Sequence, residues 1–452
     1  MTCVISPTNL GNTRFKETYN LKYAYLAGSM YKGIASVELV VKLGKAGLMG
    51  YFGTGGLRLP QIEQSIHSIQ RQLENRPQYG MNLLCNLVKP QLEEGIVDLF
   101  LKYGVRNIEA AAYMQLTHSL VWFRLKGLKR GTNGQIITCN KVLAKVSRPE
   151  VAKFFMSPAP KEIVTQLVNQ GKLSSEEAEC AQYVPIAHDI CVEADSGGHT
   201  DQGVAYALMP AMQRLRSEIQ AKYSYTEDIR IGAAGGIGAS EAIAAAFILG
   251  ADFIMTGSIN QCTVEAGTSD IVKDLLQEIN VQDTTYVPAG DMFELGAKVQ
   301  VMRKGLLFPA RANKLYELYK QYNSIDDIDE KTKVQIQNKY FKRDFEEVWK
   351  ETKSYYLKEQ PEEIEHAEKN CKHKMALIFR WYFIHTNRLA VKGIKEEIVD
   401  YQIHCGPAMG AFNQSVKGTN LEDWRNRHVD MIAERLMNGA ADILSRCYKQ
   451  WL

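Results

Sequence analysis

Residues 192–203 read V-E-A-D-S-G-G-H-T-D-Q-G, and the organisation of the whole chain follows from this stretch. The run D-I-C-V at residues 189–192 predicts a short buried strand that leads into it. Residues 196–198 then predict a turn, because S-G-G neither continues a strand nor begins a stable helix. His199 follows, and its imidazole can exchange a proton near neutral pH. A tight turn with a surface histidine is the simpler interpretation, but a second glycine-rich turn at residues 235–238 favours a functional one.

The pattern around this stretch alternates between strands and helices. From about residue 23 to residue 258, short apolar runs alternate with segments whose apolar residues have helical spacing. Eight strands, each followed by a helix, predict an α/β protein with a (β/α)₈ TIM barrel rather than an open doubly wound sheet. The predicted strands cover residues 23–27, 48–51, 79–84, 107–111, 141–146, 189–192, 229–233 and 253–256.

The remaining segments predict additions to the barrel. The connection at residues 147–184 is too long for one crossover helix, so we expect an inserted helix near the rim. We expect the barrel domain to span residues 1–310 and a helical C-terminal region to span residues 311–452. The pattern M-F-E-L-G-A-K-V-Q-V-M at residues 292–302 predicts a helix. Residues 375–391 predict a buried helix rather than a membrane span, because basic side chains interrupt the apolar run.

Composition excludes several classes of protein. A net charge of +3 over 452 residues gives no ground for nucleic-acid binding. Nine cysteines without a C-x-x-C pair argue against a disulfide framework and a zinc ribbon, and no metal cluster is expected. The N-terminus lacks the basic flank and apolar core of a signal peptide. We therefore expect a cytoplasmic protein that neither binds nor spans a membrane.

Turns that follow barrel strands carry the chemistry of a barrel enzyme. After the seventh predicted strand, residues 233–238 read A-A-G-G-I-G, and Ser240 is expected to cap the next helix. The eighth strand ends in T-G-S at residues 256–258. Backbone N–H groups at a helix start bind anions, so the two turns predict a phosphate site. No G-x-G-x-x-G follows the first strand, and the glycines of residues 53–56 lack the ending of a P-loop.

Polar side chains close two other strands. Lys145 ends an apolar run, where a charge is costly unless it is paired. An ion pair with Glu109 or Glu193 would satisfy it; the alternative is a cation beside an electron-rich ring, where it favours a reduced, anionic flavin. Asn82 is expected either to stabilise its own turn or to hydrogen-bond a flat heterocycle. Together with the phosphate site and His199, these residues favour FMN over pyridoxal phosphate, which needs a Schiff-base lysine with a defined partner.

Several longer stretches resemble one known family. They read Y-A-Y-L-A-G-S-M-Y-K-G-I-A-S (23–36), A-K-V-S-R-P-E-V-A (144–152), D-I-C-V-E-A-D-S-G-G-H-T-D-Q-G (189–203) and V-P-A-G-D-M-F-E-L-G-A-K-V-Q-V (287–301). In these motifs the chain resembles the FMN-dependent, trans-acting enoyl reductases of bacterial polyketide and polyunsaturated-fatty-acid synthases. These reductases lie within the nitronate monooxygenase-like superfamily of flavin TIM barrels. The resemblance covers nearly the whole chain and is most specific from about residue 23 to residue 349.

The resemblance implies a reaction and its participants. NADPH or NADH would reduce FMN, and the α,β-double bond of an enoyl thioester on an acyl carrier protein would then be reduced. His199 takes the place of the family's active-site histidine and is the expected proton or hydrogen-bond donor, with Lys145 as the second candidate. A homodimer is compatible with the resemblance. By position, the residues implied to contact FMN are Gly28, Ser29, Met30, Asn82, Lys145, Ser196, Gly197, Gly198, Gly235, Gly236, Ile237, Gly238, Thr256, Gly257 and Ser258.

Two other functions are alternatives. A nitronate monooxygenase-type oxidase uses the same scaffold, although the nitronate oxidisers typically show a plainer E-A-G-G-H where this chain inserts D-S. A catalytically idle flavin barrel that serves assembly is the other. For a reductase, an acidic carrier protein would need a basic docking surface. The candidate residues for that surface are Arg303, Lys304, Arg311, Lys314 and Lys320.

Overall fold

The computed structural model describes residues 5–74 and 76–451, and the chain divides into two compact units. The barrel unit comprises the residues up to 195, residues 201–267 and the residues from 414 onward. The insert unit comprises residues 196–200 and 268–413. This division differs from the expected border between residues 310 and 311. Residues 268–310 fold with the helices that follow them, and the last helix folds with the barrel.

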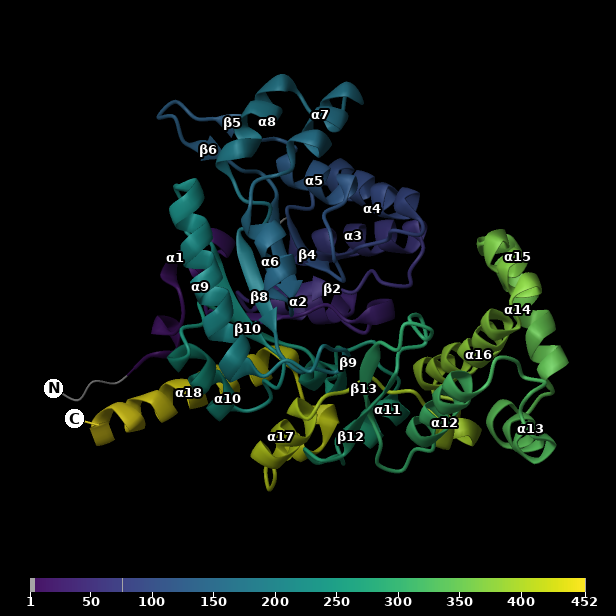
Figure 1. Ribbon diagram of the computed structural model, residues 1–452. Coiled ribbons are helices and arrows are strands. Elements are labelled where there is room, and N and C mark those ends of the chain that lie inside the picture. The colour runs from purple at the N-terminus through teal and green to yellow at the C-terminus, as the bar shows by residue number, and fades with distance from the viewer. Residues whose placement is uncertain (1–4, 75, 452) are drawn as a thin grey trace. The chain divides into compact units, whose positions relative to one another are not determined.

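Within the described ranges, the barrel unit forms a closed barrel of eight parallel strands (Figure 1). The order around the ring is β1-β11-β10-β8-β7-β4-β3-β2. Every predicted strand is present with ends within two residues of the expected ones, which confirms the predicted fold class. The strands are β1 Tyr25–Ala27, β2 Met49–Phe52, β3 Gly80–Leu84, β4 Asn107–Ala111, β7 Lys141–Val146, β8 Asp189–Glu193, β10 Arg230–Ala234 and β11 Ile254–Thr256.

Helices between the strands form the outer ring of the barrel. In α3, the four apolar residues at helical spacing are each no more than 1% exposed, so this stripe is the face that packs inward. The helix α10 ends at Ile248, and Gly250 adopts the left-handed region just beyond it, as glycines at helix C-termini often do. These helices are α2 Val37–Lys45, α3 Leu59–Leu73, α4 Pro90–Lys102, α5 His118–Leu125, α6 Pro149–Met156, α9 Ala205–Tyr223 and α10 Ser240–Ile248.

The helix α18 (Val429–Trp451) completes this ring. It packs against α10 and α2, and a Cβ added at Gly439 would lie only 2.2 Å from Oγ of Ser240. It therefore takes the place of the barrel helix that follows the last strand. The larger part of the insert unit, residues 268–413, is consequently an insertion in the connection between β11 and α18, rather than a segment added after a finished barrel.

The over-long connection at residues 147–184 contains helices beyond the crossover helix α6. These are α7 (Lys161–Asn169) and α8 (Ser175–Cys180), and a small hairpin of β5 (Lys129–Arg130) and β6 (Ile136–Ile137) lies near α8. They confirm the predicted inserted region. Each segment joins the end of a helix to the start of a strand, so it lies at the N-terminal ends of the strands (Figure 1).

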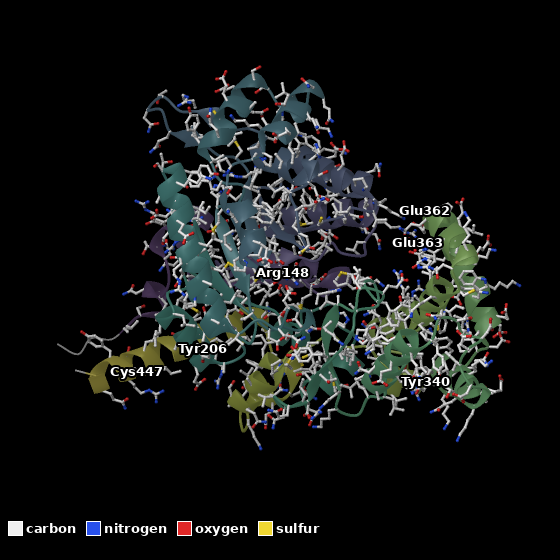
Figure 2. All side chains as sticks on the ribbon, viewed as in Figure 1. Arg148, Tyr206, Tyr340, Glu362, Glu363 and Cys447 are labelled. Carbon is white, nitrogen blue, oxygen red and sulfur yellow. The ribbon has the colours of Figure 1, made fainter. Side chains whose placement is uncertain are left out.

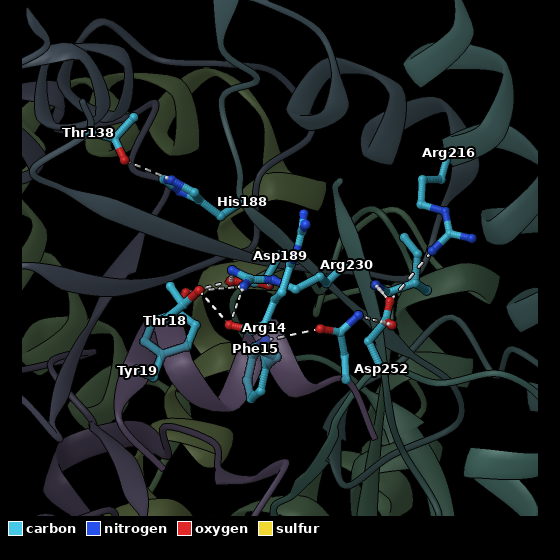
Figure 3. Close-up of polar contacts among 12 residues, drawn as sticks. Arg14, Phe15, Thr18, Tyr19, Thr138, His188, Asp189, Arg216, Arg230 and Asp252 are labelled. Carbon is cyan, nitrogen blue, oxygen red and sulfur yellow. Dashed lines mark hydrogen bonds and ion pairs between the residues drawn. The ribbon is translucent and has the colours of Figure 1, made fainter. Parts of the chain in front are cut away.

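The N-terminal end of the barrel is closed by α1 (Thr13–Tyr19) and a buried polar cluster (Figure 3). Phe15 of α1 stacks on Phe253 with ring centroids 4.3 Å apart. Tyr19 donates a hydrogen bond of 2.5 Å to Asp189, which also accepts from Arg230 at 2.5 and 3.0 Å. Asp189 is fully buried, so its charge is matched where burial is most costly. Among the described residues, this end of the barrel is therefore filled by packed side chains.

The insert unit contains a small antiparallel sheet in the order β12-β13-β9. Its strands are β12 Thr284–Pro288, β13 Lys298–Met302 and β9 Gly198–His199. The helix predicted at residues 292–302 is therefore wrong. Gly296 has a φ of +70° and interrupts the helical pattern, and the residues after it pair with strands on both sides.

Helices make up the rest of the insert unit. Its core surrounds α16, whose Phe379, Tyr382 and Phe383 are at most 2% exposed. Tyr340, Phe341, Phe345 and Trp349 lie in or against this core, so their helices each have one packed face. No helix within the described ranges is long and apolar enough to cross a membrane. The helices are α11 Asp270–Leu276, α12 Phe308–Gln321, α13 Glu330–Gln335, α14 Phe345–Glu359, α15 Pro361–Lys369, α16 Cys371–Lys392 and α17 Ala408–Ser415.

Candidate active site

The barrel mouth is the end at which the parallel strands reach their C-terminal residues. The predicted site residues of the barrel unit all lie there: residues 28–30 follow β1, Asn82 is in β3, Lys145 is in β7, residues 235–238 follow β10 and residues 256–258 follow β11. Because parallel strands end at the same edge, these residues surround one opening. The structure thus brings together most of the residues implied to contact FMN.

Lys145 forms ion pairs at the mouth. Its Nζ lies 3.3 Å from Oε1 of Glu109 and 3.5 Å from Oε1 of Glu193. Burial would lower the pKa of Lys145, but the carboxylates of Glu193 and Glu109 outweigh it and raise the pKa above the ordinary value. The lysine is therefore a permanently charged donor, and both ion pairs considered from the sequence are present.

Glu109 connects two sides of the mouth. Its side chain has no solvent exposure, and its carboxylate accepts hydrogen bonds from N of Ser29 at 2.8 Å and from Oγ of Ser29 at 2.9 Å. The same carboxylate pairs with Lys145. The turn after β1 is further held because N of Gly28 donates to O of Thr256 at 2.9 Å. From the sequence, Glu109 was predicted only as a partner for Lys145. Its hydrogen bonds to Ser29 could not be predicted, because the two residues are far apart in the chain and no local pattern links them.

The turn at residues 235–238 requires its glycines. Gly235 and Gly236 have φ values of +85° and +70°, a region that residues with a Cβ rarely adopt. A Cβ at Gly235 would lie 2.5 Å from O of Ala194, whereas beside Gly236 no atom lies within 4 Å. The helix α10 begins two residues beyond Gly238 at Ser240, with Ala239 as its N-cap, so the expected capping by Ser240 is wrong. Backbone N–H groups and open space together form a cradle that fits a phosphate.

The end of β11 supplies a second open turn. No atom lies within 4 Å of the Cβ position of Gly257. Asn260 is fully buried; its Nδ2 donates to O and Oγ1 of Thr256 at 3.1 Å, while its Oδ1 has no hydrogen-bond partner among the described residues. Asn82 is also buried, and its Nδ2 donates to the backbone O of Glu109 at 3.1 Å. The residues of both turns are therefore compatible with a phosphorylated ligand at the mouth.

Residues 196–199 belong to the insert unit. Gly198 and His199 pair with Gln300 and Val299 of β13, and Gly198 has a φ of +83°. His199 is about half exposed, and its Nε2 lies 2.9 Å from Oδ1 of Asp291. The structure thus places the predicted histidine beside a carboxylate 92 residues further along the chain.

A second histidine, His404, lies next to the S-G-G-H turn. A Cβ at Gly198 would be 3.5 Å from its Nδ1, and Nε2 of Gln402 lies 2.7 Å from its Nε2. Burial and the neighbouring His199 lower the pKa of His404 to about 4, although Asp291 acts in the opposite direction. His404 is therefore neutral at physiological pH. Neither Asp291 nor His404 was singled out from the sequence.

The candidate basic patch in the insert unit is only partly available. Arg303, Lys304, Lys314 and Lys320 are exposed. Arg311 is not, because its guanidinium pairs with the buried carboxylate of Asp400 and lies 5.0 Å from the ring of Tyr340, which Figure 2 labels. The assignment of Arg311 to a docking surface is wrong, because this residue holds the fold.

Comparison with known proteins identifies the family. A family model described as nitronate monooxygenase matches residues 12–305. The chain belongs to the nitronate monooxygenase family. Members of this family are generally flavin-dependent oxidoreductases, and the predicted resemblance is confirmed. A second model, described as the inserted helical domain of [acyl-carrier-protein] S-malonyltransferase, matches residues 322–401.

Curated relatives place the chain more closely. Over 440 residues it is 58% identical to polyketide biosynthesis protein PksE of Bacillus subtilis (strain 168), covering 97% of this chain and 57% of the relative. Over 418 residues it is 42% identical to one of the polyunsaturated fatty acid synthase subunits of Thraustochytrium sp. (strain ATCC 26185 / S-3), covering 92% of this chain and 28% of the relative. The chain therefore spans only part of these curated relatives.

Solved structures agree with this placement. The enoyl reductase domain of MlnA, from the macrolactin biosynthesis cluster of Bacillus amyloliquefaciens, is 47% identical with a TM-score of 0.94. That match covers 98% of this chain and 100% of the domain. FabK from Thermotoga maritima, at 17% identity and a TM-score of 0.57 over 97% of this chain and 99% of the other, shows a shared fold alone.

Proposed function

We propose that the protein is a trans-acting enoyl reductase that uses FMN and NADPH or NADH in polyketide or polyunsaturated fatty acid biosynthesis. Its substrate would be an α,β-unsaturated thioester on an acyl carrier protein. The observation that carries the proposal is the match to the enoyl reductase domain of MlnA, which extends over the whole of that domain. The identities to PksE and to the polyunsaturated fatty acid synthase of Thraustochytrium sp. support it.

The turns of the barrel mouth support FMN as the cofactor. Residues 235–238 and 256–258 would hold the phosphate, because Gly236 and Gly257 have open space beside them and α10 begins nearby. Residues 28–30 and Asn82 would contact the ring system. By the resemblance, Ser196, Gly197 and Gly198 would contribute to the same ligand. When bound, FMN supplies hydride transfer from the nicotinamide to the β-carbon of the enoyl thioester.

Lys145 has a role that its two carboxylate partners define. The ammonium group of Lys145 faces the carboxylates of Glu109 and Glu193. These carboxylates neutralise its charge, so Lys145 would not present an unpaired cation to the flavin ring. This argues against the interpretation that Lys145 acts simply as a cation favouring an anionic flavin. We assign it instead as a fixed hydrogen-bond donor at the end of β7. The two carboxylates set the orientation of the Lys145 side chain in advance, so no reorganisation of this donor is needed when a ligand binds.

His199 would provide the proton or hydrogen bond that the substrate needs. As negative charge develops on the thioester oxygen, a donor stabilises that oxygen, and the α-carbon must then receive a proton. An imidazole held by a carboxylate can do either task near neutral pH. His199 and Asp291 form such a pair.

A carrier protein is the expected partner. Four exposed basic residues remain as its candidate docking surface once Arg311 is removed from the patch. Carrier proteins are usually acidic, so such a surface would act mainly on the rate of encounter and would weaken at high salt. The residues are Arg303, Lys304, Lys314 and Lys320.

A nitronate oxidase is the second candidate, because the matching family model is described as nitronate monooxygenase. The two activities are tested side by side with the purified flavoprotein. Consumption of an enoyl thioester and NADPH without oxygen, and no turnover of a nitroalkane, supports the reductase. Oxygen-dependent turnover of the nitroalkane, with the enoyl thioester left unchanged, would support the oxidase instead.

A further inference from the structure

His199 and Asp291 form a side-chain pair inside the insert unit. Nε2 of His199 lies 2.9 Å from Oδ1 of Asp291, within ordinary hydrogen-bond distance. Their side chains are 47% and 65% exposed, so neither residue is needed to fill a core. A pair that contributes little to packing and joins a candidate acid to a carboxylate calls for a functional explanation.

Both partners are held in place by backbone contacts. His199 lies in β9, which pairs with β13, and N of Thr200 donates to O of Lys298 at 3.3 Å. These contacts fix the backbone that carries the imidazole. The pairing is with the neighbouring strand of the same small sheet, so the histidine does not depend on a mobile loop for its place.

Asp291 lies in the turn between β12 and β13, and its neighbours anchor it. A Cβ at Gly290 would lie 2.6 Å from Cβ of Phe383, so the backbone just before Asp291 runs directly against α16. Phe293 is 1% exposed and packs edge-to-face on Phe383. N of Ala289 donates to O of Ala297 at 2.8 Å and closes the turn. The carboxylate is therefore presented by a segment whose backbone is fixed.

The charges of Asp291 and the neighbouring histidines follow from their surroundings. Partial desolvation by the surrounding protein raises the pKa of the mostly exposed Asp291 carboxyl, but the hydrogen bond from His199 and its charge outweigh this effect and hold the pKa below the ordinary value. The nearby His404 is neutral at physiological pH, because burial lowers its pKa to about 4. The carboxylate of Asp291 is therefore ionised and faces His199 without a competing cation at His404.

We propose that Asp291 is a positioning residue that fixes the orientation and tautomer of His199. Nε2–H of His199 donates to Oδ1 of Asp291, so the neutral imidazole carries its proton on Nε2. A carboxylate behind a histidine acts in this way in general acid–base catalysis. The consequence for catalysis rests on the proposed function, whereas the tautomer does not.

The first test reads the tautomer in cofactor-free protein. ¹⁵N-histidine NMR distinguishes the two neutral tautomers, and loss of a signal in His199→Gln assigns His199. The wild type is expected to show the Nε2–H form, and Asp291→Ala is expected to give a mixture. Asp327→Asn, an exposed carboxylate of the same unit, is the matched control and should leave the signal unchanged. An unchanged tautomer in Asp291→Ala would overturn the proposal.

The second test reads the two half-reactions separately. In Asp291→Ala, reduction by NADPH should keep its rate, and reoxidation by an enoyl thioester should slow about ten- to a hundredfold, part of the usual worth of acid–base catalysis. Asp291→Glu should restore most of that loss. Equal rates in the wild type and Asp291→Ala would overturn the catalytic part. The two proposals can fail separately. If the tautomer depends on Asp291 but the wild type does not turn over any enoyl thioester, the proposed function is overturned and the positioning of His199 by Asp291 still holds.

Discussion

Nζ of Lys145 lies 3.3 Å from Oε1 of Glu109, a carboxylate without solvent exposure that also binds the turn after β1 through Ser29. One buried side chain thus holds the end of β7 and the end of β1 across the mouth of the barrel. The geometry of the mouth depends on Glu109 as much as on the residues expected to contact a ligand.

Replacing Glu109 by Gln should destabilise the protein and weaken flavin binding. Lys145 would keep only Glu193 as its partner, and removing one member of a buried ion pair typically costs about 3–5 kcal/mol. Ser29 would lose its charged acceptor at the same time. Thermal unfolding and flavin content after purification measure both effects.

Glu63→Gln is the matched control for this variant, because Glu63 pairs with Lys102 on the surface of α3. Exposed pairs contribute little to stability, so this variant should behave like the wild type. If Glu109→Gln and Glu63→Gln had the same thermal stability and the same flavin content, Glu109 would not hold the barrel mouth in the geometry that binds flavin.

The phosphate cradle is tested at Gly236. Gly236→Asp places a Cβ and a carboxylate in the open space beside the turn, where they would exclude and repel a phosphate, so FMN should be lost. Gly171→Asp is the control, because Gly171 has a φ of +71° and open space like Gly236 but lies between α7 and α8. Absorbance of the purified variants gives the flavin content. Stoichiometric flavin in Gly236→Asp would place the phosphate elsewhere.

His199→Ala should separate the two half-reactions. The variant should retain FMN and accept reducing equivalents from NADPH at the normal rate. Reoxidation by an enoyl thioester should slow by about a hundred- to ten-thousandfold, the usual contribution of general acid–base catalysis. Stopped-flow absorbance measures both steps, with His67→Ala on α3 as the control. Equal slowing of both steps would indicate that His199 positions the flavin instead.

The strands were predictable because each one is a local pattern. An apolar run such as R-I-G-A-A in β10 is followed directly by glycines, and the structure adds nothing to that reading except the exact ends. The same holds for the glycine turns and for the helical spacing in α3. Local chemistry therefore gave the barrel and most residues of its mouth.

Long-range relationships could not be predicted in this way. The place of α18 in the ring depends on packing with α10 after the whole insert unit has intervened. Asp291 meets His199 only because β13 pairs with β9. In β13 itself, Val299 and Val301 have the alternate spacing of a strand, but the predicted helix runs through Gly296, whose positive φ ends the preceding turn. These features depend on which segments pair or pack in three dimensions, and a single sequence does not reveal those partners.

The position of α18 gives a stability prediction. Leu436 is 1% exposed in a helix that packs on α10 and α2, so Leu436→Ala should destabilise the barrel unit by about 2–5 kcal/mol. Thermal release of flavin reports the barrel unit directly. Met431→Ala, at a side chain 50% exposed on the same helix, should change it little. If Leu436→Ala released flavin at the same temperature as the wild type, α18 would not be part of the barrel.

The most direct test of the proposed function is an anaerobic two-step titration of the purified protein. NADPH is expected to bleach the flavin absorbance, and an enoyl thioester on a carrier protein is expected to restore it, one equivalent of saturated thioester forming for each flavin. The account would be contradicted if the absorbance returned only when oxygen was admitted and the enoyl thioester was recovered unchanged.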